Sequence, residues 1–228
     1  MRNILTIFKK QIKDTLKNKT VLIQFILFPV LTMIFENAIN IEGMEENFFT
    51  KLFSITYIGM APLTNVASII SEEKEKNTLR VLTMANVKPW QYLIGVGVYV
   101  WCICMLGAGV MATGLNREDI PFYLIVMAIG FVISILAGAC VGVYANNQMV
   151  ATSLVCPIML VFAFAPMLAI FNEKIAKFAK IFYTQQLRII MDEMTFSEIK
   201  TDSVCILAVN AVLMVILFFA LFRKKGLE

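Results

Sequence analysis

The 228-residue sequence contains no histidine, and charged residues make up only 16% of it. Without histidine the chain lacks the commonest metal ligand and general base, which excludes a Ser–His protease. Soluble domains carry about 25% charged residues, whereas 59% of this chain is hydrophobic. No soluble fold buries that much apolar surface, so the sequence predicts an integral membrane protein.

Cysteine-based sites and phosphate-binding loops are missing as well. An odd number of cysteines without a CxxC pair indicates neither a disulfide framework nor a zinc site, and we interpret them as small apolar residues. The five lie in or beside apolar runs: Cys102, Cys104, Cys140, Cys156 and Cys205. No G-x-x-x-x-G-K-[ST] occurs, so the chain does not hold ATP in a P-loop, and we predict no cofactor bound by this chain.

Long apolar runs predict an all-α fold with six membrane-spanning helices in one domain, residues 1–228. A span needs about 20 residues. We place the spans at about 20–36, 52–71, 91–114, 122–145, 150–171 and 203–222, the fifth being interrupted by Pro157 and Pro166. Apolar residues at 175, 178 and 182 indicate a short helical excursion between the fifth and sixth spans. Gly138-x-x-x-Gly142 in the fourth span permits a close helix approach.

Residues 1–19 form a basic, amphipathic segment with six Lys or Arg residues against one acidic residue, Asp14. Such a helix lies in the headgroup plane of a membrane. A signal peptide is the rival interpretation, but no small-x-small cleavage site follows the apolar run. The basic excess in this segment, in residues 72–90 and in the C-terminal tail predicts that both termini face the cytoplasm of a cell-membrane protein. Basic residues placed in loops in this way do not support nucleic-acid binding.

Fixed charge is scarce inside the predicted spans. Glu36 either marks the outer boundary of the first span or lines a polar vestibule. Weak candidates for a substrate pathway are Glu36, Thr64, Asn65 and Ser68, although such residues in a bundle usually bond to neighbouring helices. Ion-coupled carriers usually keep ionisable groups in the membrane, and neither an arginine ladder nor a TVGYG filter is present. A self-sufficient channel or secondary carrier remains an alternative and would depend on Glu36 or Asn65.

A charged segment, residues 71–90, separates the second and third spans. Acidic residues crowd its beginning, where a helix dipole favours negative charge, and Pro89 ends the pattern. We expect a helix over residues 72–84 that lies on the membrane surface and can bind a soluble partner. An ordinary solvated loop is the alternative.

The sequence IISEEKEKNTLRVL, residues 69–82, resembles the signature of type-2 ABC exporter permeases, roughly E-[KR]-E-x-G-T-[LM]-x-x-L-x-x-x-P-V. The matching residues are Glu73, Lys74, Glu75, Thr78, Leu79 and Leu82. Asn77 replaces the usual glycine and tolerates unusual backbone angles, and the proline–valine pair is only approximated, by Asn86 and Val87. The order of an amphipathic helix, six spans and a late excursion is similar to that family over nearly the whole chain.

The resemblance implies a non-catalytic permease subunit that works with two cytoplasmic ATPase subunits, which bind ATP and Mg²⁺, and with a second permease copy or sister chain. In that family the charged segment is the coupling helix that docks on the ATPase. The resemblance assigns this contact to Glu72, Glu73, Lys74, Glu75, Lys76, Thr78, Leu79, Arg80 and Leu82. It assigns a second cytoplasmic contact to Asn146, Asn147 and Gln148.

The substrate is indicated only by the chemistry of the spans. A pathway without fixed charge suits lipophilic or amphipathic cargo, and 14 Met and 18 Phe residues can supply adaptable apolar walls. We expect export of an amphipathic peptide such as a toxin or antimicrobial peptide, with a drug or lipid as alternatives. Ordinary lipid-facing and core packing explains the same residues, and a structural membrane protein without transport is a further alternative.

Overall fold

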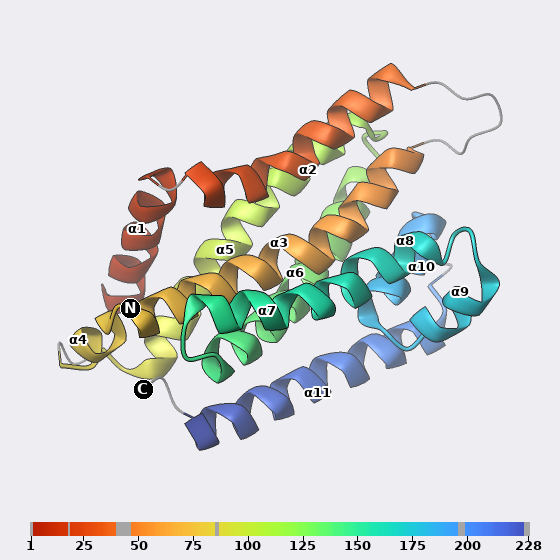
Figure 1. Ribbon diagram of the computed structural model, residues 1–228. Helices are drawn as coiled ribbons and strands as arrows, with labels where there is room; N and C mark the ends of the chain where they lie inside the picture. Colours follow the sequence, from red (N-terminus) through yellow and green to blue (C-terminus); the bar gives the residue numbers. More distant parts are fainter. Residues whose placement is uncertain (1, 18, 40–46, 85–86, 196–198, 226–228) are drawn as a thin grey trace.

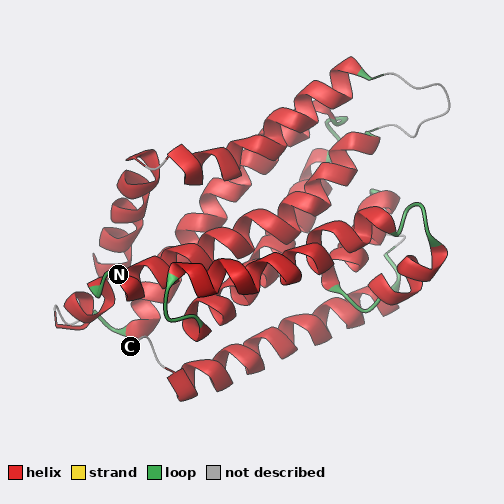
Figure 2. Cartoon of the chain, in the orientation of Figure 1, coloured by secondary structure: helices red, strands yellow, loops and turns green. Residues whose placement is uncertain are grey.

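The computed structural model describes residues 2–17, 19–39, 47–84, 87–195 and 199–225. All regular structure in these ranges is helical (Figure 2). The helices are α1 (Arg2–Lys17), α2 (Lys19–Ala38), α3 (Phe48–Glu75), α4 (Thr78–Met84), α5 (Pro89–Met111), a 3₁₀ turn (Ala112–Gly114), α6 (Ile120–Tyr144), α7 (Gln148–Met159), a π-helical segment (Leu160–Phe164), α8 (Ala165–Leu168), α9 (Glu173–Ala179), α10 (Tyr183–Glu193) and α11 (Thr201–Lys225).

The long helices run side by side, and α3 lies at the centre of the bundle (Figure 1). It contacts α2, α5, α6, α7 and α10, and 78% of its most apolar stretch is buried. In contrast, only 6% of the corresponding stretch of α11 is buried. Helix α11 therefore lies at the edge of the bundle, where its apolar side chains face the surroundings.

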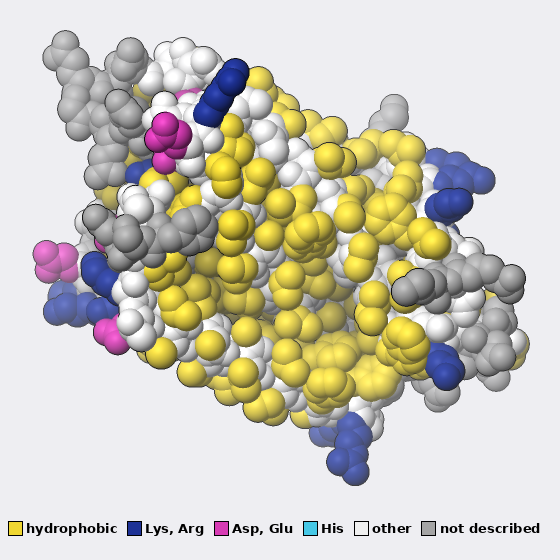
Figure 3. All heavy atoms as spheres, turned by 180° about the vertical axis from the view of Figure 1, so that it is seen from behind, with side chains coloured by type: hydrophobic (Ala, Val, Ile, Leu, Met, Phe, Trp, Pro, Cys, Tyr) yellow, Lys and Arg dark blue, Asp and Glu magenta, His cyan; other side chains and the backbone are white. Residues whose placement is uncertain are grey.

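Five helical stretches in the described part of the chain are long and apolar enough to cross a membrane: α3, α5 with its 3₁₀ turn, α6, α7 through α8, and α11. A sixth crossing results if α1 and α2 are counted as one element with a 74° bend. On the face seen in Figure 3, hydrophobic side chains cover the middle of the bundle and charged side chains gather towards its two ends. These features confirm the all-α membrane fold predicted from the sequence.

The two ends of the bundle differ in structure (Figure 1). At one end, called here the α4 end, lie α1, α4, the α6–α7 loop and the last turn of α11. At the other end, called the α9 end, lie α8, α9, α10, the last turn of α2 and the first turn of α3. The predicted excursion between the last two spans corresponds to α9 and α10.

The span expected at residues 150–171 is not one regular helix. It consists of α7, the π-helical segment and α8. Pro157 lies within α7, and Pro166 stands in the first turn of α8. Proline removes a backbone donor from the helical ladder, and π-helical turns accommodate the resulting irregularity within a helix.

Glycine allows two backbone segments to meet at the centre of the bundle. A Cβ atom at Gly59 of α3 would lie 2.6 Å from the carbonyl carbon and oxygen of Phe162 in the π-helical segment. A Cβ atom at Gly138 of α6 would lie 2.6 Å from the carbonyl oxygen of Leu63. The close approach predicted for Gly138 and Gly142 therefore occurs within this chain, against α3.

Candidate functional site

The charged segment between α3 and α5 folds as two helices. Helix α3 continues to Glu75, and α4 begins at Thr78. Asn77 between them has a φ of 57°, in the left-handed region that asparagine tolerates better than most residues. The expectation of one helix over residues 72–84 is corrected, because this turn ends α3 and redirects the chain. The Thr78 hydroxyl donates a 3.0 Å hydrogen bond to the backbone oxygen of Glu73 across the turn.

We predict that Asn77→Ala lowers the free energy of unfolding by about 1 kcal/mol or more, because alanine is strained in the left-handed region. Asn77→Gly should leave it near the native value, since glycine adopts this conformation without a steric cost. The thermal unfolding midpoint of the detergent-purified chain measures both. Equal midpoints for the alanine and glycine variants would contradict the turn geometry.

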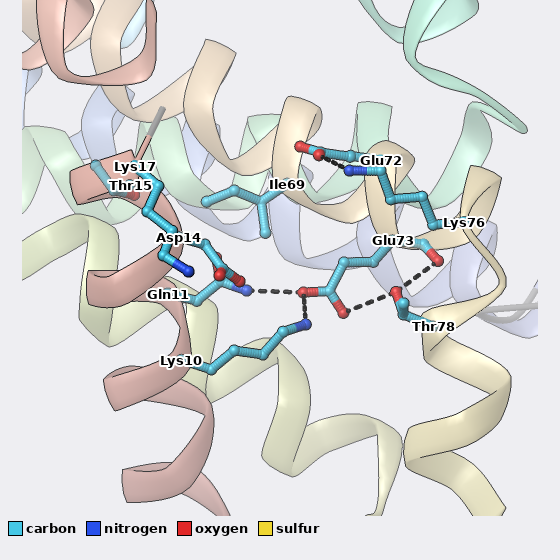
Figure 4. A pocket seen from close by; sticks show the side chains of 10 residues that line it. All are labelled: Lys10, Gln11, Asp14, Thr15, Lys17, Ile69, Glu72, Glu73, Lys76 and Thr78. Carbon is cyan, nitrogen blue, oxygen red and sulfur yellow. Dashed lines mark hydrogen bonds and ion pairs between the residues drawn. The ribbon is translucent and has the colours of Figure 1, made fainter. Parts of the chain in front are cut away.

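Glu73 lies at the junction of three helices (Figure 4). The residue is 7% exposed, and one carboxylate oxygen accepts hydrogen bonds of 2.8 Å from both Lys10 Nζ and Gln11 Nε2. The Thr78 hydroxyl lies 3.5 Å from the other oxygen. The carboxylate thus joins α1 to the end of α3 and the start of α4.

Removal of this carboxylate should destabilise the junction. We predict that Glu73→Ala lowers the free energy of unfolding by about 1.5–3 kcal/mol, because it removes charge-assisted hydrogen bonds and leaves the buried Gln11 amide without this acceptor. Glu72→Ala is the matched control. Glu72 pairs with Lys76 on the surface, and an exposed pair of this kind contributes at most about 1 kcal/mol. A loss of stability as large for the control as for Glu73→Ala would contradict the junction role.

A pocket of about 320 Å³ opens between α1 and the α3–α4 turn (Figure 4). Its lining contains both signs of charge: Lys10, Gln11, Asp14, Thr15, Lys17, Ile69, Glu72, Glu73, Lys76 and Thr78. The hydrogen bond and the charge of Glu72 raise the pKa of the Lys76 amine. Lys76 therefore remains protonated at neutral pH.

The loop between α6 and α7 lies directly beside the end of α3. The backbone N–H of Gln148 donates a 2.9 Å hydrogen bond to the Glu75 carboxylate, and its side-chain amide donates one of 3.0 Å to the Ser68 hydroxyl. Lys74 donates a 2.9 Å hydrogen bond to the Val143 carbonyl at the end of α6. The two regions predicted to contact a partner thus form one continuous surface at the α4 end.

Comparison with known proteins identifies the family. The model of the ABC-2 family transporter proteins matches residues 3–222, nearly the whole chain. The chain belongs to the ABC-2 transporter family. It is the membrane-spanning permease subunit of an ABC transporter. A search of curated proteins found no match.

The permease exposes only part of the predicted coupling segment. Glu75, Lys76 and Asn77 are exposed at the turn, Glu72, Lys74, Thr78 and Leu82 are half-buried, and Leu79 is 5% exposed. Arg80 belongs to α4, but its side chain lies outside the described residues. Of the predicted second contact, Asn146 is exposed, and Asn147 caps α7 by accepting a 2.9 Å hydrogen bond from the Val150 N–H.

Two predicted contacts lie inside the permease instead of on its surface. Glu73 bonds to α1, and Leu79 belongs to the chain's own hydrophobic core. The exposed apolar side chains of α4 are Val81 and Met84, with 63% and 75% exposed. The family resemblance assigned no contact to these two residues, and the only available signal was their i,i+3 spacing. The contacts of Lys10 and Gln11 with Glu73 left no recognisable pattern in the sequence.

The four candidate pathway residues do not form one site. The Glu36 carboxylate accepts hydrogen bonds of 2.8 and 3.0 Å from the backbone and the hydroxyl of Thr50, at the α9 end. Thr64 donates to the Met60 carbonyl, and Ser68 bonds to Gln148. Thr50 and Asn65 are separated by about 22 Å along α3, at 1.5 Å per residue.

Asn65 is the most unusual of these pathway candidates. It is 1% exposed, and its amide nitrogen donates a 2.8 Å hydrogen bond to the Ala61 carbonyl. Its side-chain oxygen is buried without a hydrogen-bond partner in the described part of the chain. An unpaired buried oxygen is costly, and at 1% exposure this oxygen is enclosed by the bundle.

Proposed function

We propose that this permease exports a lipophilic or amphipathic substrate, with energy from ATP hydrolysed by a separate ATPase that docks on the α4 end. One observation carries the proposal: the α3–α4 turn, α4 and the α6–α7 loop form one surface that exposes Val81 and Met84. Hydrogen bonds connect this surface with α1, α3 and α6. A force applied at the surface would therefore reach the central spanning helix.

In this proposal two ATPase subunits act on two permease subunits, either two copies of this chain or this chain and a sister. ATP and Mg²⁺ bind to the ATPase. The α4 end faces the cytoplasm of a cell-membrane complex, which places both termini there, in agreement with the basic excess of these segments. Closure of the ATPase dimer pushes the α3–α4 turn, and α3 passes the displacement to the helices packed around it.

Apolar grooves along α11 support the choice of substrate. One, of about 430 Å³, lies between α6, α10 and α11, and another, of about 410 Å³, lies between α6, α7 and α11. Both are lined almost entirely by hydrophobic side chains, such as Val126 and Leu207 in the first and Ile158 and Met214 in the second. Such walls suit the apolar part of an amphipathic peptide, a drug or a lipid, and we favour the peptide.

Photo-crosslinking in the native membrane tests the docking surface. A crosslinking residue at Met84 or at Asn146 should capture a soluble protein with a P-loop, and the same residue at Phe178, which is exposed at the α9 end, should not. Purification of the tagged chain in mild detergent should yield that ATPase in equal amount. A second six-span protein in the preparation would show a heteromeric permease. Absence of an ATPase from both experiments would overturn the proposal and favour a channel or carrier.

A further inference from the structure

One face of α1 is fixed to the bundle. Ile7 is 3% exposed and lies against α5, where a Cβ atom at Gly95 would be 2.9 Å from its side chain. Asn3 donates a 3.0 Å hydrogen bond to the Gln91 side chain. Together with the contacts from Lys10 and Gln11 to Glu73, these interactions set which side of α1 remains free.

The free face combines exposed apolar residues with a row of lysines. Leu5, Ile12 and Leu16 are 59%, 36% and 66% exposed. Lys9, Lys13 and Lys17 are exposed at successive i,i+4 positions, so they form one row along the helix. None of the three amines has a carboxylate partner within 4.0 Å among the described residues.

The row of lysines directly borders the apolar residues. Lys9 lies one helical turn from both Leu5 and Ile12, and Lys13 lies one turn from Leu16. Asp14, the single acidic residue of α1, lines the pocket shared with Glu73, and Lys17, at the end of the row, lies at the rim of the same pocket. Where the free face borders the apolar strip, its charged residues are therefore the lysines Lys9 and Lys13.

The position of α1 places this face at a membrane surface. The helix turns by 74° from the direction of α2 and lies at the α4 end of the bundle (Figure 1), beyond the ends of the apolar spanning helices. Apolar side chains flanked by lysines insert into the headgroup region while the amines reach the phosphates. A soluble acidic protein would pair with the lysines but would leave the apolar strip without a role.

We propose that Lys9, Lys13 and Lys17 form a binding site for the phosphate groups of anionic phospholipids, with Leu5, Ile12 and Leu16 inserted among the acyl chains. The inference goes beyond the proposed export function, because it requires neither an ATPase nor a substrate. Each lysine near an anionic surface strengthens binding of a basic segment about fivefold. The three together provide roughly a hundredfold preference for anionic over neutral lipid.

Hydrogen exchange of α1 in the full-length chain tests this site without any ATPase. The chain is placed in nanodiscs of phosphatidylcholine alone or of an equimolar mixture with phosphatidylglycerol. We expect exchange of α1 amides to be at least about tenfold slower in the anionic discs at low salt, with the difference reduced by added salt. The variant K9Q/K13Q/K17Q should lose this difference, and K9R/K13R/K17R should retain it.

A matched control removes the same charge elsewhere. Lys174, Lys177 and Lys180 are exposed in and just after α9 at the opposite end, so K174Q/K177Q/K180Q should leave the response of α1 unchanged. Equal α1 exchange in the two kinds of disc would overturn the proposal, as would a full response in K9Q/K13Q/K17Q. Protection of α1 in phosphatidylcholine discs by added glycerol phosphate would identify a site for soluble phosphate instead. If α1 still responds to anionic lipid but no ATPase docks on the α4 end, only the export proposal is refuted.

Discussion

Replacing Val81 and Met84 with aspartate will abolish ATPase binding while the permease remains folded. Both side chains are exposed on α4, so the substitutions create no buried charge in the permease. At an apolar interface, each of two central contacts contributes about 2 kcal/mol, which corresponds to roughly 30-fold in affinity. We expect V81D/M84D to weaken binding of the purified ATPase by roughly 1,000-fold, if the two effects add, and to eliminate transport.

The control for this prediction is F178D/I181D. Phe178 and Ile181 have the same i,i+3 spacing, lie in and just after the short helix α9, and are 57% and 65% exposed. This pair introduces the same two charges at the α9 end and should leave ATPase affinity unchanged. Near-native affinity of V81D/M84D, with an unchanged elution profile, would show that α4 is not the docking element. Substitution of Glu73 or Leu79 cannot decide the question, because both residues are buried and their loss also affects folding.

Adding one methyl group at two glycines of the central packing will strongly destabilise the permease. The new Cβ atoms in G59A and G138A would lie 2.6 Å from backbone atoms of Phe162 and Leu63. Backbone atoms cannot move aside as the end of a side chain can, so α3 has to separate from its neighbours. Overpacking typically costs about 1–3 kcal/mol at each site. The thermal unfolding midpoint of each variant, and of the double variant, measures the loss.

Gly109 provides the matched control for these two glycines. It lies in the spanning helix α5, and among the described residues an added Cβ atom would meet no atom within 4 Å beyond its own turn of helix. Gly109→Ala should leave stability unchanged or raise it by up to about 1 kcal/mol, because alanine favours the helix. If G138A lowered the unfolding midpoint no more than G109A does, the helix packing at Gly138 would be looser than described.

Much of this fold follows from local chemistry that the sequence displays directly. Long apolar runs without internal charge determined an all-α membrane protein, because only helices satisfy every backbone polar group of such a segment in lipid. The signature around Glu73 and Thr78 indicated the ABC-2 family through residue identity and spacing alone. Pro157 and Pro166 predicted an interruption of the fifth span, since neither residue can donate a backbone hydrogen bond.

Only the tertiary structure decided which side chains face outward and which elements meet. The period of a short helix identifies an apolar face but not its partner. The sequence therefore could not show that Leu79, the expected external contact, lies in the core while Val81 and Met84 are exposed. The contact of Glu73 with Lys10 and Gln11 spans more than 60 residues. It depends on how α1 folds back across the bundle. Composition and periodicity fix what each segment prefers locally, whereas the packing of distant segments fixes the docking surface.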